Sequence, residues 1–196
     1  DPKEQSVRLG AIEAIAVRAF NLSHLQPPQP LANPDLEPAL FRLASDDDPL
    51  VRSETAYALG QVGAPECLDR LEAMLDDAYP DARENAAVAL AHHGRAKAVA
   101  TLAEMLNPAE SADGGQDDAA GARAANLALT MTSALAAAED LARQNPDADL
   151  SPVIQAIKNL VGAKESPAGD KTKPASATID PQIVAAAHHT LEVLEK

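Results

Sequence analysis

Histidines are the side chains of this sequence whose spacing best suits chemistry, because neutral imidazole is the commonest protein ligand of metal ions. Four of the 5 histidines form two adjacent pairs, His92-His93 and His188-His189. On a helix His188 and Glu192 would lie one turn apart and could share a cation. Zinc usually needs at least three protein ligands at fixed distances. We therefore interpret His188, His189 and Glu192 as a solvated polar helix face and predict no metal site. His92 and His93 are expected at a helix end, where a cationic side chain suits the helix dipole.

The other polar motifs form no catalytic constellation. The acidic run of residues 46–48 lacks the spaced oxygen ligands of a calcium-binding loop, and capping of a helix explains it better. The sequence has no glycine-rich phosphate loop and no serine nucleophile elbow. The single cysteine, Cys67, fits a small buried core residue. We predict a protein that is not an enzyme, with no catalytic residues and no cofactor.

Two stretches in the middle of the chain nearly repeat each other. Residues 46–63 read DDDPLVRSETAYALGQVG, and residues 77–94 read DAYPDARENAAVALAHHG. The identical pairs are Asp46/Asp77, Pro49/Pro80, Arg52/Arg83, Ala56/Ala87, Ala58/Ala89, Leu59/Leu90 and Gly63/Gly94. A fixed period of this length is typical of a solenoid, in which stacked helix pairs share one continuous core.

Each copy predicts two helices, called here an A helix and a B helix. Asp48 and Pro49 favour the start of the A helix, since Asp caps free N–H groups and Pro suits the first helical position. Gly63 favours its left-handed end. The B helix follows at once, with apolar residues spaced for one buried face, Leu68, Leu71 and Leu75 in one copy and Val99, Leu102 and Leu106 in the next.

The same signals extend in both directions along the chain. They predict an all-α fold, a right-handed α-solenoid of antiparallel helix pairs in a single domain covering residues 1–196. It would contain about four repeats, at residues 4–45, 46–76, 77–107 and 121–162, and a closing helix at residues 180–195. Segments rich in proline, glycine or charge predict flexible connections at residues 26–34, 107–121 and 162–178.

The repeat pattern resembles the HEAT-repeat family, in particular its short bacterial form, which is also seen in phycobilisome-lyase-like proteins. The residues that carry the resemblance are Asp48, Pro49, Val51, Arg52, Ala56, Ala58, Leu59, Gly60 and Gly63. The second copy departs from the pattern at Ala91, which stands in place of Gly60. The resemblance implies an α-solenoid that binds other macromolecules. A HEAT-type di-iron hydroxylase family uses His-Glu pairs, and no His-Glu dipeptide occurs in this sequence.

Composition excludes several classes of partner. The net charge of −14 opposes nucleic acid, whose binding needs clustered Lys and Arg, and it disfavours anionic membranes. No apolar run is long enough to insert into a bilayer. The first residue is Asp, so we interpret the chain as a mature form or a piece of a longer one. The compartment, cytoplasm or periplasm, would depend on what precedes it, and the oligomeric state stays open.

Arginines are the most regular polar feature. Arg8, Arg52, Arg83 and Arg123 occupy matching positions near the start of each A helix, within reach of Glu4, Asp48, Asp81 and Asp118. Stacking would bring them into a row. We predict a structural ladder that ties repeat to repeat, because arginines in an acidic chain are best explained as internally neutralised. The alternative is a binding site for an acidic partner.

The B helices are expected to line the inner curve, as the HEAT resemblance implies. Helical wheels direct one set of polar residues outward, and we call this set the B-helix strip: Arg42, Glu66, Asp69, Arg70, Lys97, Thr101, Glu104 and Gln155. We predict a non-catalytic scaffold that binds a protein or peptide through this strip. A subunit of a cofactor or chromophore lyase and a purely structural spacer are the alternatives.

Overall fold

The computed structural model describes residues 1–31, 33–107, 120–162 and 179–195, and this part of the chain is helical without any β-strand. It divides into two compact units, Asp1–His93 and Gly94–Lys196. The all-α prediction and the predicted stacking of antiparallel helix pairs are confirmed within these units. That the whole chain forms one domain stays a prediction, and each unit is described by itself.

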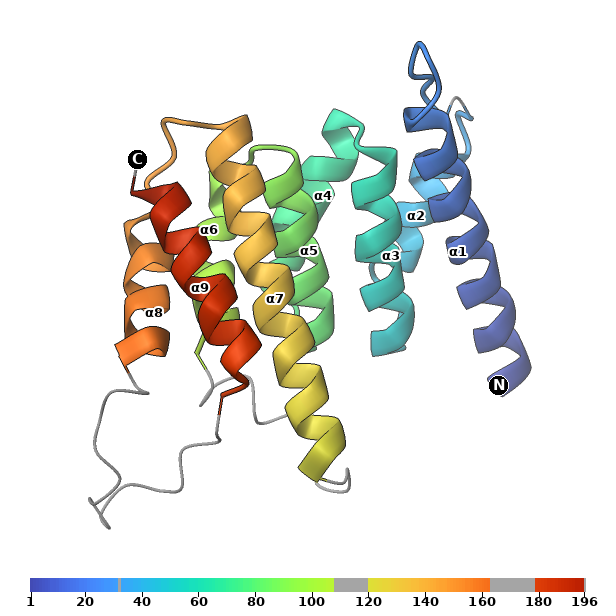
Figure 1. The fold of residues 1–196 in the computed structure, drawn as a ribbon. Helices are drawn as coiled ribbons and strands as arrows, with labels where there is room; N and C mark the ends of the chain where they lie inside the picture. The colour runs from blue at the N-terminus through green and yellow to red at the C-terminus, as the bar shows by residue number, and fades with distance from the viewer. Residues whose placement is uncertain (32, 108–119, 163–178, 196) are drawn as a thin grey trace. The chain divides into compact units, whose positions relative to one another are not determined.

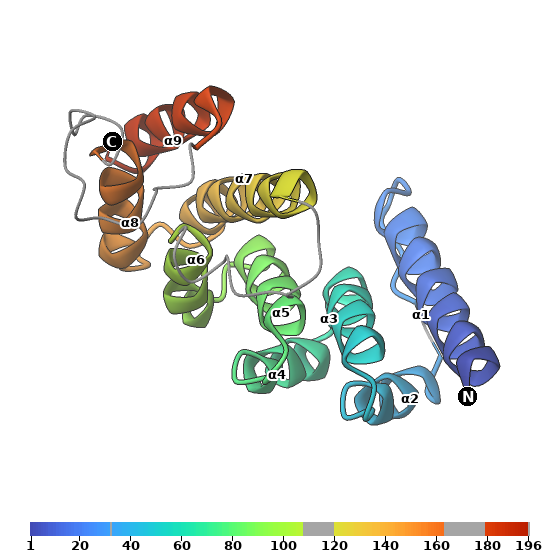
Figure 2. The same cartoon turned by 90° about the horizontal axis from the view of Figure 1, so that it is seen from below.

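The N-terminal unit contains five helices: α1 (Pro2–Ser23), α2 (Leu36–Leu43), α3 (Pro49–Val62), α4 (Pro65–Met74) and α5 (Pro80–His92). The A helices α1, α3 and α5 pack side by side in chain order, and the B helices α2 and α4 form a second layer beside them (Figures 1 and 2). Helix α1 leads into α2 and α3 leads into α4, so the unit consists of two stacked helix pairs followed by α5.

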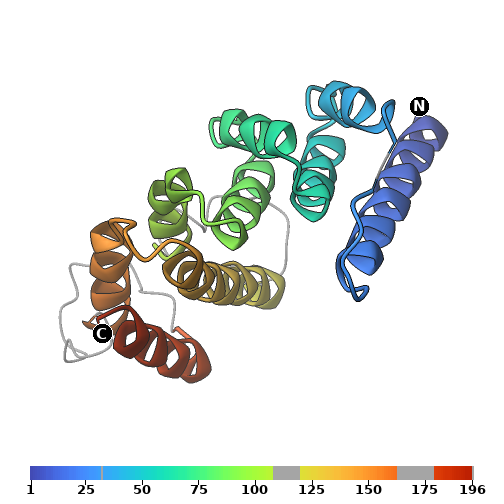
Figure 3. The ribbon, with the colours of Figure 1, turned by 90° about the horizontal axis from the view of Figure 1, so that it is seen from above.

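The C-terminal unit has the same two layers. Its elements are the 3₁₀ turn η1 (Ala96–Ala98) and the helices α6 (Val99–Met105), α7 (Ala120–Gln144), α8 (Ser151–Gly162) and α9 (Pro181–Leu194). The A helices α7 and α9 pack together, and the B helices α6 and α8 pack together (Figure 3). The predicted flexible segments 107–121 and 162–178 lie almost wholly outside the described residues.

Helix starts and ends follow the predicted local signals. The Asp48 side chain accepts a hydrogen bond from the Leu50 backbone N–H at 3.0 Å, and Pro49 is the first helical residue. Gly63 and Gly94 follow the A helices with φ angles of 65° and 71°, the left-handed conformation that glycine tolerates best. The predicted boundaries of these helices are confirmed. They could be predicted because Asp, Pro and Gly act on the backbone beside them.

Close approach of α3 and α5 depends on small residues. A Cβ atom added to Gly60 would lie 2.5 Å from the Cβ of Ala89, so only glycine allows this separation. Leu59 of α3 and Leu90 of α5 are fully buried. Cys67 is buried as predicted, and burial raises its pKa to about 11, so the thiol stays protonated and unreactive at neutral pH.

The predicted flexible connection at residues 26–34 begins against the end of α1. The backbone N–H groups of Leu25 and Gln29 both donate to the carbonyl of Leu22, at 3.3 and 3.0 Å.

Within the described residues, none of the helices is both long enough and apolar enough to cross a bilayer.

Candidate functional site

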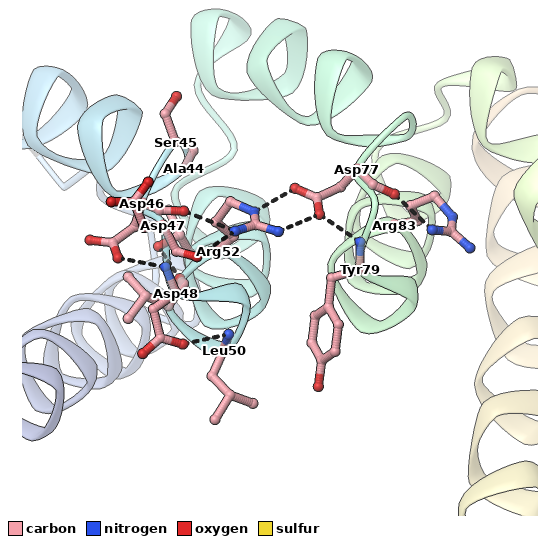
Figure 4. A network of polar contacts seen from close by, with 12 residues as sticks. Ala44, Ser45, Asp46, Asp47, Asp48, Leu50, Arg52, Asp77, Tyr79 and Arg83 are labelled. Atoms are coloured by element: carbon pink, nitrogen blue, oxygen red, sulfur yellow. Dashed lines mark hydrogen bonds and ion pairs between the residues drawn. The ribbon is translucent and has the colours of Figure 1, made fainter. Parts of the chain in front are cut away.

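The centre of the arginine ladder is a two-bond contact between Arg52 and Asp77. Arg52 Nε and Nη2 donate to the two carboxylate oxygens of Asp77 at 2.7 and 2.9 Å (Figure 4). The Arg52 Nη1 atom also donates to the carbonyls of Asp46 and Asp47, at 2.9 and 3.3 Å. Paired donors of this kind match a carboxylate in both distance and direction. Arg52 therefore joins the start of its own repeat to the start of the next one.

Arg8 and Arg83 occupy the positions that match Arg52 in the neighbouring repeats, and they make similar contacts. Arg8 Nε lies 3.3 Å from Asp46 Oδ2, and Asp46 is the residue that matches Asp77 in the preceding repeat. Arg83 Nη1 donates to the Asp77 carbonyl at 2.7 Å, as Arg52 does to that of Asp46. Arg52 and Arg83 thus contact the loop that begins their own repeat, and Arg8 and Arg52 reach the acidic side chain that begins the following repeat.

The predicted carboxylate partners need correction. Arg8 and Arg52 pair with Asp46 and Asp77, and not with Glu4 and Asp48. Asp48 instead caps α3 and accepts a hydrogen bond from Gln5 Nε2 at 2.6 Å, which joins α1 to α3. A residue that caps a helix directs its carboxylate along the helix axis, away from an arginine one turn later.

Asp81 is likewise not the carboxylate partner that was predicted for Arg83. It is exposed in the first turn of α5, and its carboxylate interacts with the hydroxyl group of Tyr79. The first turn of a helix favours a negative side chain without any arginine. The side chain of Arg123 and Asp118 lie outside the described residues.

The hydrogen bonds between Arg52 and Asp77 shift the pKa values of both side chains. The side-chain hydrogen bond from Arg52 is the main reason that the pKa of Asp77 lies below its usual value. The same bond raises the pKa of Arg52. The two side chains are only 17% and 10% exposed, so the charges are held against each other where water has limited access to them.

A second connection between α3 and α5 was not predicted from the sequence. His93 Nε2 lies 2.8 Å from the Gly60 carbonyl, and Asn85 Nδ2 donates to the Ser53 carbonyl and hydroxyl at 3.2 and 3.1 Å. The sequence predicts His93 only at a helix end, without a contact to another helix. The signal that could have found this contact is Gly60, because a glycine within a helix allows another element to approach its backbone.

In the N-terminal unit, the B-helix strip is only partly as predicted. Arg42, Glu66 and Asp69 are exposed. Arg70 is half-buried and donates to the Ala44 carbonyl at 3.0 Å and to the Ser45 hydroxyl. Ala44 ends α2, so the Arg70 charge satisfies the C-terminal end of the neighbouring B helix. The prediction that Arg70 points outward to a partner is wrong.

In the C-terminal unit, the prediction is again wrong for one residue of the B-helix strip. Lys97, Glu104 and Gln155 are exposed, and Gln155 Nε2 donates to the side-chain oxygen of Asn159 at 2.9 Å. Thr101 is only 8% exposed and belongs to the buried face of α6. The prediction of an outward Thr101 is therefore wrong.

The histidine pair of α9 lies on an exposed polar face. His188, His189 and Glu192 are all exposed, and Glu195 Oε1 forms an ion pair with Lys158 Nζ at 2.7 Å. Over the described ranges, no group of three or more His, Cys, Asp or Glu side chains is placed to hold a metal ion. This part of the chain does not offer the ligand set that a structural or catalytic metal requires.

Two open depressions mark the surface of the N-terminal unit. One, of about 600 Å³, lies between the connection near Pro30 and the turn between α3 and α4 near Pro65. The other, of about 400 Å³, lies beside α1 and is lined by Lys3, Glu4, Val7 and Arg8. Neither lining contains an aromatic side chain, whereas pockets for large planar ligands are usually lined by aromatic residues.

Comparison with known proteins identifies the repeats. Residues 1–91, nearly the whole N-terminal unit, match the family model described as HEAT repeats. A 62-residue stretch, 31% of this chain, is 39% identical to a deoxyhypusine hydroxylase of Candida albicans, and it spans 20% of that protein. The chain therefore covers only a fifth of this relative. No solved structure matches. The sequence match and the helix pairs of the N-terminal unit agree that residues 1–91 of this chain are HEAT repeats.

Proposed function

We propose that the chain is a non-catalytic HEAT-repeat scaffold whose B helices bind a protein or peptide partner. The observation that supports this proposal is the division of charged side chains in the N-terminal unit. Arg8, Arg52 and Arg70 contact neighbouring repeats, whereas Arg42 and Glu66 project from the B helices and are exposed. The internal contacts hold the repeats together, and the exposed side chains are available to a partner.

The charge of this surface favours a basic partner. With Arg70 engaged at α2, the exposed strip of the N-terminal unit consists of Arg42, Glu66 and Asp69, and Asp35 and Asp76 are exposed at its ends. Complementary charge raises association rates and selects partners more than it raises affinity. The strip has no aromatic anchor of the kind that dominates tight interfaces, so we expect modest affinity.

The test is a comparison of two neutralising changes. The double variant Glu66→Gln/Asp69→Asn removes two exposed charges from the strip, and Glu54→Gln removes one exposed charge from α3 in the A layer as a control. Affinity purification with quantitative mass spectrometry should give partners whose recovery falls about three- to tenfold with the double variant and is unchanged with the control. Equal recovery from all three proteins would contradict binding through the B helices.

A catalytic role is the second candidate, favoured by the similarity to the deoxyhypusine hydroxylase. The scaffold proposal expects no stoichiometric transition metal in the purified protein and no change in Tm with a chelator. A bound metal together with a fall in Tm of several degrees would favour catalysis instead. The lyase and spacer alternatives stay proposals, and the absence of aromatic side chains from the two described depressions does not favour the lyase.

A further inference from the structure

Between Lys3 and Asn21, the side of α1 directed away from α3 carries an exposed apolar stripe. Val7 and Val17 are 73% and 53% exposed, and they lie on one side of the helix with Gly10, Ala11 and Ala14, which are also exposed. A Cβ atom added to Gly10 would meet nothing within 4 Å. We call these five residues the α1 outer face. An apolar helix face normally packs against another element.

The same positions are buried in the other A helices of the unit. In α5 they are Ala82, Ala86 and Ala89, which are buried beside α3. In α3 they are Val51, Thr55 and Ala58, which are fully buried. In α1 the matching residues are Val7, Ala11 and Ala14. The α1 outer face thus has the composition that an A helix of this stack uses to pack against a neighbouring helix.

The other terminal A helix is different. The corresponding exposed side of α9 in the C-terminal unit carries His188, His189 and Glu192. A polar outer face is what a capping repeat needs in water, and it does not complement an apolar surface. Head-to-tail association through α9 of another copy therefore does not explain the α1 outer face.

The charged residues flanking the α1 outer face have opposite signs, so they could form ion pairs with the same residues of a second copy. Glu4 and Arg18 are exposed on the same side of α1, spaced evenly before and after Ala11. If two copies of α1 pair antiparallel about Ala11, Glu4 of each copy lies beside Arg18 of the other, and two ion pairs form. Parallel pairing would place like charges together.

We propose that the α1 outer face binds the same face of a second copy of this chain, with the two α1 helices antiparallel about Ala11. A shared surface of this kind gives a closed two-fold dimer. One helix pair lies at the small end of the range for stable interfaces, so we expect a dissociation constant of about 10–100 µM.

Sedimentation velocity over a range of concentrations tests the proposal. The unchanged chain should form dimers, and Ala14→Glu should abolish them. Tyr57→Glu, at an exposed position of α3 in the same unit, is the control and should leave dimerisation unchanged. Circular dichroism at low concentration will verify that each variant is folded.

A charge swap provides the most specific test. Glu4→Arg or Arg18→Glu alone should weaken the dimer about tenfold, because each creates two like-charge contacts. The double variant Glu4→Arg/Arg18→Glu should recover the original affinity within about threefold, since both pairs are restored with reversed sign. A monomer at the highest soluble concentration, a dimer that tolerates Ala14→Glu, or a double variant without recovery would each overturn the proposal.

Discussion

Replacing Arg52 by alanine should test the ladder most directly. The substitution removes both bonds to Asp77 and the bonds to the carbonyls of Asp46 and Asp47. Asp77 would then keep a backbone donor, the Tyr79 N–H at 2.8 Å, but its carboxylate, which is 10% exposed in the intact chain, would lose the arginine that neutralises it. Breaking a completely buried pair costs about 3–5 kcal/mol, and losing an exposed pair costs about 0–1 kcal/mol. Because some water reaches this pair, we expect a loss of about 2–3 kcal/mol in the free energy of unfolding.

The chain contains a matched control for this experiment. Arg143 Nη1 lies 2.6 Å from Asp140 Oδ1, but the two side chains are 66% and 26% exposed. Arg143→Ala should therefore cost no more than about 0.5 kcal/mol. Urea unfolding followed by circular dichroism is the suitable assay, because guanidinium would screen the charges. Equal losses for the two variants would refute the conclusion that burial, and not distance alone, makes the Arg52 contact stabilising.

The pH dependence gives an independent measurement of the same contact. The hydrogen bond from Arg52 lowers the pKa of Asp77 in the folded state, so the carboxylate contributes stability above its unfolded pKa of about 3.9. That contribution is lost as the pH falls through the lower folded pKa. The difference in unfolding free energy between the unchanged chain and Arg52→Ala should be constant from about pH 8 to 5 and should shrink below about pH 4. A difference that stays constant down to pH 2 would assign the loss to contacts other than the Asp77 charge.

Four further substitutions test the packing of the N-terminal unit. Gly60→Ala should destabilise the chain by about 1–3 kcal/mol, because the new methyl group overlaps Ala89, whereas Gly10→Ala should stabilise it by about 0.5–1 kcal/mol, because the space is empty and alanine favours the helix. Thermal melts of both at low concentration will decide, and similar effects of the two changes would contradict the close approach of α3 and α5. Arg70→Ala should cost about 1 kcal/mol through its lost bond to the end of α2, and Arg42→Ala, at an exposed position on α2, should cost less than half of that in the same urea assay.

Helix order and helix ends could be predicted from the sequence because their causes are local. Asp48 and Pro49 act on the first turn of α3, and Gly63 ends it within the same segment. The partners of the arginines are not local. Asp77 lies at the start of the next repeat, and a search limited to nearby carboxylates selects Asp48 instead. The repeat itself contained the better signal, because Asp46 and Asp77 are identical residues at matching positions.

The misplacement of Thr101 has a geometrical cause. The B helix that contains it begins with the 3₁₀ turn Ala96–Ala98 before α6 starts at Val99. A 3₁₀ turn rotates the chain by about 20° more per residue than an α-helix does. A wheel drawn with constant α-helical rotation from Lys97 therefore accumulates an error and directs Thr101 toward solvent. The structure instead turns it into the core, with 8% of its surface exposed.

The misplacement of Arg70 has a different cause and affects the functional conclusion. A helical wheel considers one helix, and on α4 alone Arg70 lies on the outward side. In the stack, α2 lies beside α4, and its terminal carbonyl at Ala44 is within hydrogen-bond distance of Arg70. An unsatisfied carbonyl at a helix end attracts a cation, so the neighbour determines the direction of the side chain. Once Arg70 is used inside the stack, the exposed strip of this unit loses a positive charge. It becomes more acidic than the sequence indicated, which is the physical reason to expect a basic partner.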